Sequence, residues 1–275
     1  MRRSRVILLM LPALLGLAAA PAGAWPESPD VTTERTTATL VALPADGTDS
    51  IAVGLRLRLK PGWHTYWRNP GDAGEAVAVR LAIGERSSTG PTIWPLPEMI
   101  EASGVVSYGH HGEAVFTTVV SVPRDGAPTR IEAEATWLAC AEVCVPESGK
   151  FSLVAPAGAA PPAAPSTTAA TPARGDGVLA GAPGAWRVSA PWRTPAGARI
   201  ESAYFFPYDG ASIDHSAPQK MTVDSDTLAL ALKPLDPRRT PPRAIEGLLR
   251  VDVRAGGGLA ATWIELTARA APPAE

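Results

Sequence analysis

The sequence predicts an all-β protein made of two β-sandwich domains joined by a proline- and alanine-rich linker. Three observations lead to this prediction. Short runs of alternating apolar residues recur along the chain. Turn-forming pairs such as Pro61-Gly62, Gly90-Pro91 and Asp125-Gly126 separate these runs. No segment of any length carries a helical period, and short strands at this spacing are typical of a β-sandwich.

The first 24 residues have the pattern of a signal peptide. Arg2, Arg3 and Arg5 precede an apolar stretch at 6–20, and Ala22-Gly23-Ala24 supplies a small-x-small cleavage site. The apolar stretch is short for a membrane anchor, which needs about 20 residues. We therefore expect an exported protein that is soluble after cleavage and has no stable membrane insertion. Cleavage would remove three arginines from a chain of formal charge −2, and the resulting acidic protein is a poor partner for nucleic acid.

The mature chain divides into three zones by composition. The predicted first domain spans 31–154, the linker spans 155–184 and the second domain spans 185–269. The linker is almost entirely Ala, Pro, Gly, Ser and Thr, so it cannot bury enough apolar surface to fold. Strands are expected in the first domain at 36–43, 50–59, 77–83, 115–122, 131–139 and 151–154. Strands are expected in the second domain at 200–206, 221–223, 227–232, 247–253 and 259–267.

Cys140 and Cys144 are the two cysteines of the chain. In an extended strand their Cα atoms would lie about 13 Å apart, at roughly 3.3 Å per residue. A disulfide requires Cα atoms within about 7 Å. If the two pair, residues 141–143 must therefore form the tip of a tight loop between two strands.

Such a short bridge would be a weak structural cross-link. A loop of about 5 residues contributes only about 2 kcal/mol, compared with about 4.7 kcal/mol for a loop of about 100 residues. A local bridge at a loop tip can also open without unfolding the domain, which favours thiol–disulfide exchange. The Cys-x-x-x-Cys spacing differs from the Cys-x-x-Cys of thioredoxin-like proteins. Glu142 lies between the thiols and disfavours a thiolate, which suits a disulfide that a partner attacks.

Three stretches resemble the amino-terminal periplasmic domain of DsbD-type thiol:disulfide interchange proteins, and more closely their ScsB branch. The stretches are PGWHTYWRNPGDAG at 61–74, WPLP at 94–97 followed by Tyr108-Gly109, and CAEVCVP at 140–146. The resemblance of these three stretches covers 31–154. A further stretch at 204–208 resembles the second extracytoplasmic domain of ScsB-like proteins.

The resemblance implies an immunoglobulin-like fold for these sandwiches and a function in electron relay. Cys140 and Cys144 would be the redox pair, in the manner of a protein-disulfide reductase component that needs no cofactor. His64 and Tyr66 match positions where the family places aromatic side chains beside the cysteines. Tyr108 falls at the end of the family's active-site cap loop. The implied partners are periplasmic thioredoxin-like or disulfide-bonded proteins.

Two departures from the DsbD pattern alter these expectations. The position that matches the cap-loop phenylalanine is Ser107, so the cysteine pair is expected to be more open. The sequence ends at Glu275 without a membrane electron-carrying domain or a thioredoxin domain. The resemblance therefore implies a membrane electron donor in trans.

Two alternatives remain open at this point. The first is a non-catalytic binding or adaptor protein whose disulfide only shapes a loop. The second is a copper-binding, copper-tolerance protein in which His110, His111 and Met99 join the cysteines as soft Cu(I) ligands. All three hypotheses predict the same fold, so the choice depends on the site.

Overall fold

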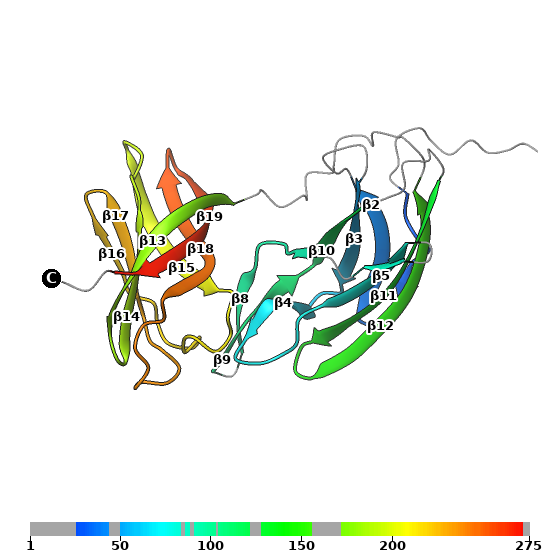
Figure 1. The fold of residues 1–275 in the computed structure, drawn as a ribbon, viewed down its shortest axis with the longest axis horizontal. Coiled ribbons are helices and arrows are strands. Elements are labelled where there is room, and N and C mark those ends of the chain that lie inside the picture. The colour runs from blue at the N-terminus through cyan, green and yellow to red at the C-terminus, as the bar shows by residue number, and fades with distance from the viewer. Residues whose placement is uncertain are drawn as a thin grey trace, which may run out of the picture.

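A computed structural model describes residues 26–43, 50–83, 86–88, 91–102, 104–121, 128–155 and 172–271 (Figure 1). These residues form nineteen strands and no helix, which confirms the all-β prediction. The described part of the chain therefore holds no helix that could cross a membrane. The predicted signal peptide at 1–24 and most of the predicted linker lie outside the described residues.

The first domain packs two sheets against each other. One sheet has the strand order β1-β2-β3-β10-β7. Its strands are β1 (Val31–Thr32), β2 (Thr36–Leu43), β3 (Ser50–Leu59), β7 (Thr92–Ile93) and β10 (Glu113–Ser121). Leu40, Leu55 and Phe116 are fully buried on its inner face. The alternating apolar residues that predicted a strand at 50–59 are thus the ones that fill the core from β3, and the strand predicted at 36–43 is also present.

The second sheet of this domain carries both cysteines. Its strands are β4 (His64–Gly71), β5 (Ala78–Ile83), β6 (Arg86–Ser88), β8 (Glu98–Ala102), β9 (Val105–His111), β11 (Thr129–Cys140) and β12 (Cys144–Ala155). β11 lies at its centre: β12 pairs along one edge, while β5 and then β4 pair along the other. β9 and β8 continue outward from β4. Ile131, Ala133, Ala135 and Trp137 alternate inward along β11 and close the core.

The second domain is one continuous seven-stranded sheet, with the order β15-β18-β19-β13-β14-β17-β16. The predicted pair of separate sheets is therefore not seen. Instead the single sheet curls around a core that includes Leu179, Trp186, Phe205 and Leu249. Its strands are β13 (Ala173–Ala182), β14 (Ala185–Pro191), β15 (Ala198–Pro207), β16 (Met221–Asp224), β17 (Thr227–Leu232), β18 (Ala244–Ala255) and β19 (Gly258–Ala270).

The predicted domain boundary at residue 185 is too late. Residues 173–182 were expected to be linker, yet they form β13, which pairs with β14 on one edge and in parallel with β19 on the other. This segment is rich in Gly and Ala and buries only Leu179 fully. Its place in the sheet rests on backbone hydrogen bonds, which composition does not reveal.

The two domains are packed together through β4 and β9. Trp67, Val106 and Tyr108 of the first domain form one buried cluster with Phe206 and Leu248 of the second. Figure 1 shows β8 and β9 on the side of the first domain that faces the second. Trp67 is 1% exposed, because the second domain covers it.

Polar contacts fix the position of this interface. Asn69 Nδ2 donates to the carbonyl oxygen of Pro207 over 2.8 Å, and Ser216 Oγ donates to Asp72 Oδ2 over 2.6 Å. The guanidinium of Arg68 lies 4.0 Å from the centre of the Tyr208 ring. These contacts come from 67–72, a segment in which Asn69-Pro70-Gly71 signals a turn. The structure extends β4 to Gly71 instead.

Candidate functional site

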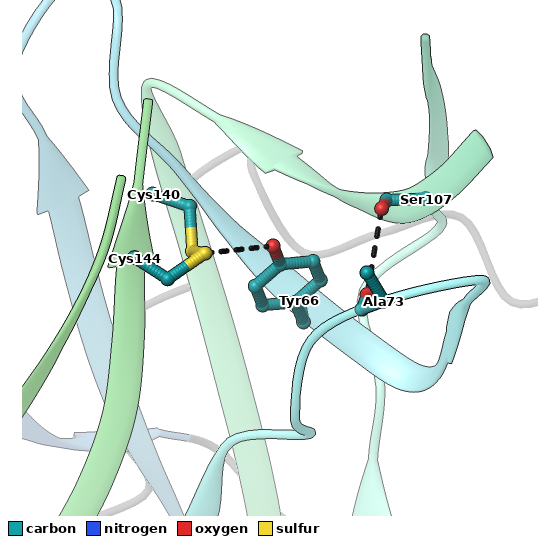
Figure 2. Close-up of a disulfide and its surroundings, with 5 residues drawn as sticks. All are labelled: Tyr66, Ala73, Ser107, Cys140 and Cys144. Carbon is teal, nitrogen blue, oxygen red and sulfur yellow. Dashed lines mark hydrogen bonds between the residues drawn. A yellow bond between two sulfur atoms is a disulfide. The ribbon is translucent and has the colours of Figure 1, made fainter. Parts of the chain in front are cut away.

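Cys140 and Cys144 form a disulfide at the tip of the β11–β12 hairpin (Figure 2). The two residues face each other as the last register pair of the hairpin, with Cα atoms 4.1 Å apart. Residues 141–143 make the turn, closed by a bond from the Ala141 amide to the Val143 carbonyl. The predicted tight loop between two strands is confirmed.

The two sulfur-bearing residues differ in exposure. Cys140 ends the central strand β11, has β4 on its other side, and is only 1% exposed. Cys144 begins β12 and is exposed. Among the described residues no strand pairs with the outer edge of β12. Cys144 is therefore the more accessible residue of the pair, while Cys140 is shielded.

Tyr66 lies beside the exposed sulfur. Its hydroxyl donates a hydrogen bond to Cys144 Sγ over 3.3 Å, since the disulfide sulfur carries no proton (Figure 2). Burial raises the pKa of the Tyr66 phenol, so this donor keeps its proton at neutral pH. A phenol at this distance favours negative charge on Cys144 when that sulfur is a thiolate.

The segment between β4 and β5 covers the Tyr66 ring. Gly74 has φ +107°, and a Cβ at this position would clash with the ring. The adjacent Ala73 carbonyl accepts a bond of 3.4 Å from Ser107 Oγ (Figure 2). Ser107, which the resemblance led us to expect in place of a cap-loop phenylalanine, anchors the segment between β4 and β5 through this bond.

A row of four side chains crosses the sheet at the disulfide. Cys144, Cys140, His64 and His111 are successive register partners on β12, β11, β4 and β9. Directly opposed residues of antiparallel strands place their side chains on the same face. The His64 ring contacts the His111 ring and the Tyr66 ring, each with a centroid separation of 5.5 Å. The predicted neighbours His64 and Tyr66 are thus brought to the disulfide.

The histidines of this row sit in unlike environments. His64 is 8% exposed, and burial, followed by the charge of His111, lowers the pKa of its imidazole. The side chain of His111 is 48% exposed, and its Nδ1 lies 3.1 Å from Glu98 Oε2. The sequence did not single out Glu98, which is 13 residues away along the chain. The β8–β9 register brings them together, and only the pairing of those strands could have indicated it.

The other two proposed supporting residues are placed differently. Glu142 lies in the exposed turn between the cysteines. Tyr108 points to the opposite face of β9 from His111, because 108 and 111 differ by an odd number of residues. Its hydroxyl meets Tyr204 Oη at 2.8 Å and His215 Nδ1 at 3.0 Å, so it belongs to the domain interface.

The candidate copper ligands are not assembled. His110 and His111 are neighbours in one strand and therefore face opposite sides of the sheet. His110 is 4% exposed and packs against Phe116, while Met99 lies exposed on β8. Among the described residues no group of three or more His, Cys, Asp or Glu could hold a metal ion. Burial, then the charge of His111, lowers the pKa of His110 to about 4.

The fold and the site together define an all-β domain that presents one local disulfide at a hairpin tip. Residues 32–156 match the family "Thiol:disulfide interchange protein DsbD, N-terminal". This part of the chain therefore is a domain of the DsbD N-terminal family, as the sequence motifs indicated.

Solved structures extend the similarity beyond this domain. The N-terminal periplasmic domain of ScsB from Proteus mirabilis matches with a TM-score of 0.59 and 17% identity, over 90% of this chain and 99% of that one. At this identity the likeness concerns the fold, and it spans both domains. A match to titin domains Z1Z2 in complex with telethonin covers 88% of this chain and all of that one, with 14% identity and a TM-score of 0.20, too low to bear on the fold. No curated protein matches the chain significantly.

Proposed function

We propose that this protein is a periplasmic thiol:disulfide interchange module that relays electrons between partner proteins through Cys140 and Cys144. The observation that carries the proposal is the unequal exposure of the two cysteines in a short local disulfide within a DsbD N-terminal family domain. The immunoglobulin-like character of the first-domain sandwich and export by residues 1–24 belong to the same proposal. A thioredoxin-like or disulfide-bonded periplasmic protein is the expected partner.

Reduction would begin at the exposed sulfur. A partner thiolate attacks Cys144 Sγ, the Cys140–Cys144 bond breaks, and Cys140 leaves with the electron pair as a thiolate that takes up a proton. A second partner thiol then attacks the partner's own sulfur and releases Cys144 as a thiolate beside the Tyr66 hydroxyl. The partner becomes a disulfide and this protein a dithiol, so two electrons have moved.

Oxidation follows the reverse route through the same sulfur. Cys144 as a thiolate attacks the disulfide of a downstream partner and forms a mixed disulfide. Cys140 then attacks Cys144 Sγ, restores the internal disulfide and releases the partner in reduced form. Because Cys140 is buried directly opposite Cys144, it is placed to resolve the complex and is closed to outside attack.

Single-cysteine variants test this proposal. Cys140→Ser removes the resolving thiol, so it should accumulate covalent complexes with periplasmic proteins or with an added thioredoxin, and reductant should release them. Cys144→Ser retains only the buried thiol and serves as the matched control with few complexes. If neither variant traps a partner and the reduced protein melts far below the oxidised one, the disulfide is a structural cross-link of an adaptor protein and the proposal fails.

A further inference from the structure

Opening the disulfide creates a charge where water cannot solvate it. When a thiolate attacks Cys144, the sulfur that leaves is Cys140, which is 1% exposed. A buried thiolate is strongly disfavoured because burial penalises the charged form. The Cys140 sulfur therefore needs a proton, and the exposed side of the disulfide cannot supply it once a partner covers Cys144.

His64 is the titratable group placed to supply that proton. It is the register partner of Cys140 on β4, on the same face of the sheet, and is itself 8% exposed. While the disulfide is closed, burial lowers the pKa of His64 and the ring is neutral. A thiolate formed at Cys140 would favour the protonated ring, because an opposite charge nearby stabilises the charged form. His64 thus gains a proton when Cys140 needs one.

His111 and Glu98 connect His64 to solvent. The His64 and His111 rings are in contact, with centroids 5.5 Å apart, so a ring rotation or one bridging water molecule can carry a proton between their nitrogens. Both His111 and Glu98 are about half exposed, with side-chain exposures of 48% and 52%. The Glu98 carboxylate accepts from Nδ1 of His111, which leaves Nε2 to exchange a proton. Tyr66, on the same strand, is a further group beside His64.

We propose that His64, His111 and Glu98 form a proton path that protonates Cys140 when the disulfide opens. This inference rests on the proposed exchange function and assigns its acid–base residues. The partner thiolate and the disulfide give a mixed disulfide at Cys144 and a thiolate at Cys140. His64 in its protonated form transfers a proton to that thiolate, His111 returns one to His64, and water returns one to His111. Glu98 orients His111 and is a positioning residue.

The test is the pH profile of reduction by dithiothreitol, with each rate divided by the concentration of dithiothreitol thiolate. In the wild-type protein this normalised rate should rise only at pH values below the ordinary histidine pKa of about 6.5, because burial lowers the pKa of His64. His64→Gln and His111→Gln should flatten the rise and slow opening at least about tenfold. Added imidazole should restore the rate of a His64→Ala variant, which a purely structural role of His64 would not permit.

Matched variants make the outcomes distinct. His110→Gln changes the adjacent histidine on the opposite face of β9, and its profile should follow the wild type. His111 is half exposed, so His111→Gln keeps the test valid even if the His64 variants do not fold. If wild type exchanges readily and His111→Gln keeps its rate and profile, the proton path is wrong while the exchange function stands. If wild type does not react with thiols at all, the proposed function itself fails.

Discussion

The two faces of the β4–β9 strand pair have opposite chemistry. One face carries His64, Tyr66 and His111 beside the disulfide. The other carries Trp67 and Tyr108, which are sealed under the second domain. Because successive residues of a strand alternate between faces, a short segment serves both purposes. The second domain thus packs against the same two strands that carry the groups beside the disulfide.

This comparison predicts that substitutions on the sealed face cost stability, whereas those on the disulfide face alter chemistry. On the face of β4 and β9 that the second domain covers, the buried polar groups form a hydrogen-bond network. His215 Nε2 donates to the Gly210 carbonyl, so its Nδ1 accepts from the Tyr108 hydroxyl, which in turn accepts from Tyr204. Every hydroxyl of this set has a partner, as a buried network requires.

Trp67→Ala should give the largest effect. Removing this fully buried ring from its contact with Phe206 and Tyr208 should cost about 3–5 kcal/mol in the free energy of unfolding, the usual range for a buried aromatic residue. Urea unfolding followed by circular dichroism measures it. The matched control is Trp63→Ala, a half-buried tryptophan stacked on Arg35 outside the interface. Equal losses from both variants would mean that the interface adds nothing.

Acid should weaken the protein through His110, on the core side of β9. Its folded pKa of about 4 lies below the ordinary value of 6.5. Between these values the unfolded chain binds a proton that the folded chain does not, so stability falls as the pH drops from 6.5 to 4. The loss should reach up to about 3 kcal/mol. Above pH 6.5 His110 causes no loss of stability, and below pH 4 the loss stays constant.

Unfolding measured across this pH range checks the assignment. His110→Leu should abolish the part of the slope that His110 contributes, because Leu cannot take up a proton in the unfolded state. His111→Gln, on the half-exposed side of the same strand, should retain it. A slope that survives His110→Leu unchanged would show that other groups cause the acid sensitivity.

Reduction of the disulfide should have the smallest effect on stability. The bridge closes a loop of only about 5 residues, so reduction should cost at most about 2 kcal/mol. Unfolding of the oxidised and reduced proteins at one pH measures the difference, and a Cys140→Ser, Cys144→Ser double variant gives the reference without any thiol. If reduction lowers the free energy of unfolding as much as Trp67→Ala does, the disulfide is a structural cross-link.

Several strands were predicted correctly from their apolar residues. The prediction missed strands whose composition is typical of a turn or a linker. Residues 36–43, 50–59 and 227–232 are strands with the expected bounds. β4 was missed because Asn69-Pro70-Gly71 has the composition of a turn, and β13 because Gly and Ala carry almost no apolar signal. β4 pairs with β9 and β11, and β13 pairs with β19 as well as with the adjacent β14, so partners distant in sequence help to hold both strands.

The site was predictable only as far as local spacing and family motifs reach. The spacing of Cys140 and Cys144 required a turn, and the structure has one. The motif at 61–74 indicated His64 and Tyr66, which lie beside the disulfide, whereas the second stretch indicated Tyr108, which faces the second domain. The unequal exposure of the cysteines and the contact of His111 with Glu98 depend on strand register, and no single segment encodes register.

The assignment of Cys144 as the reactive sulfur is tested most directly by measuring the reactivity of each thiol separately. The folded Cys140→Ser and Cys144→Ser variants would be reacted with Ellman's reagent at neutral pH, and the labelling rates compared. We expect Cys144, at the exposed start of β12, to react at least about tenfold faster than the buried Cys140. Equal rates, or faster labelling of Cys140, would contradict the assignment of Cys144 as the sulfur through which electrons enter and leave.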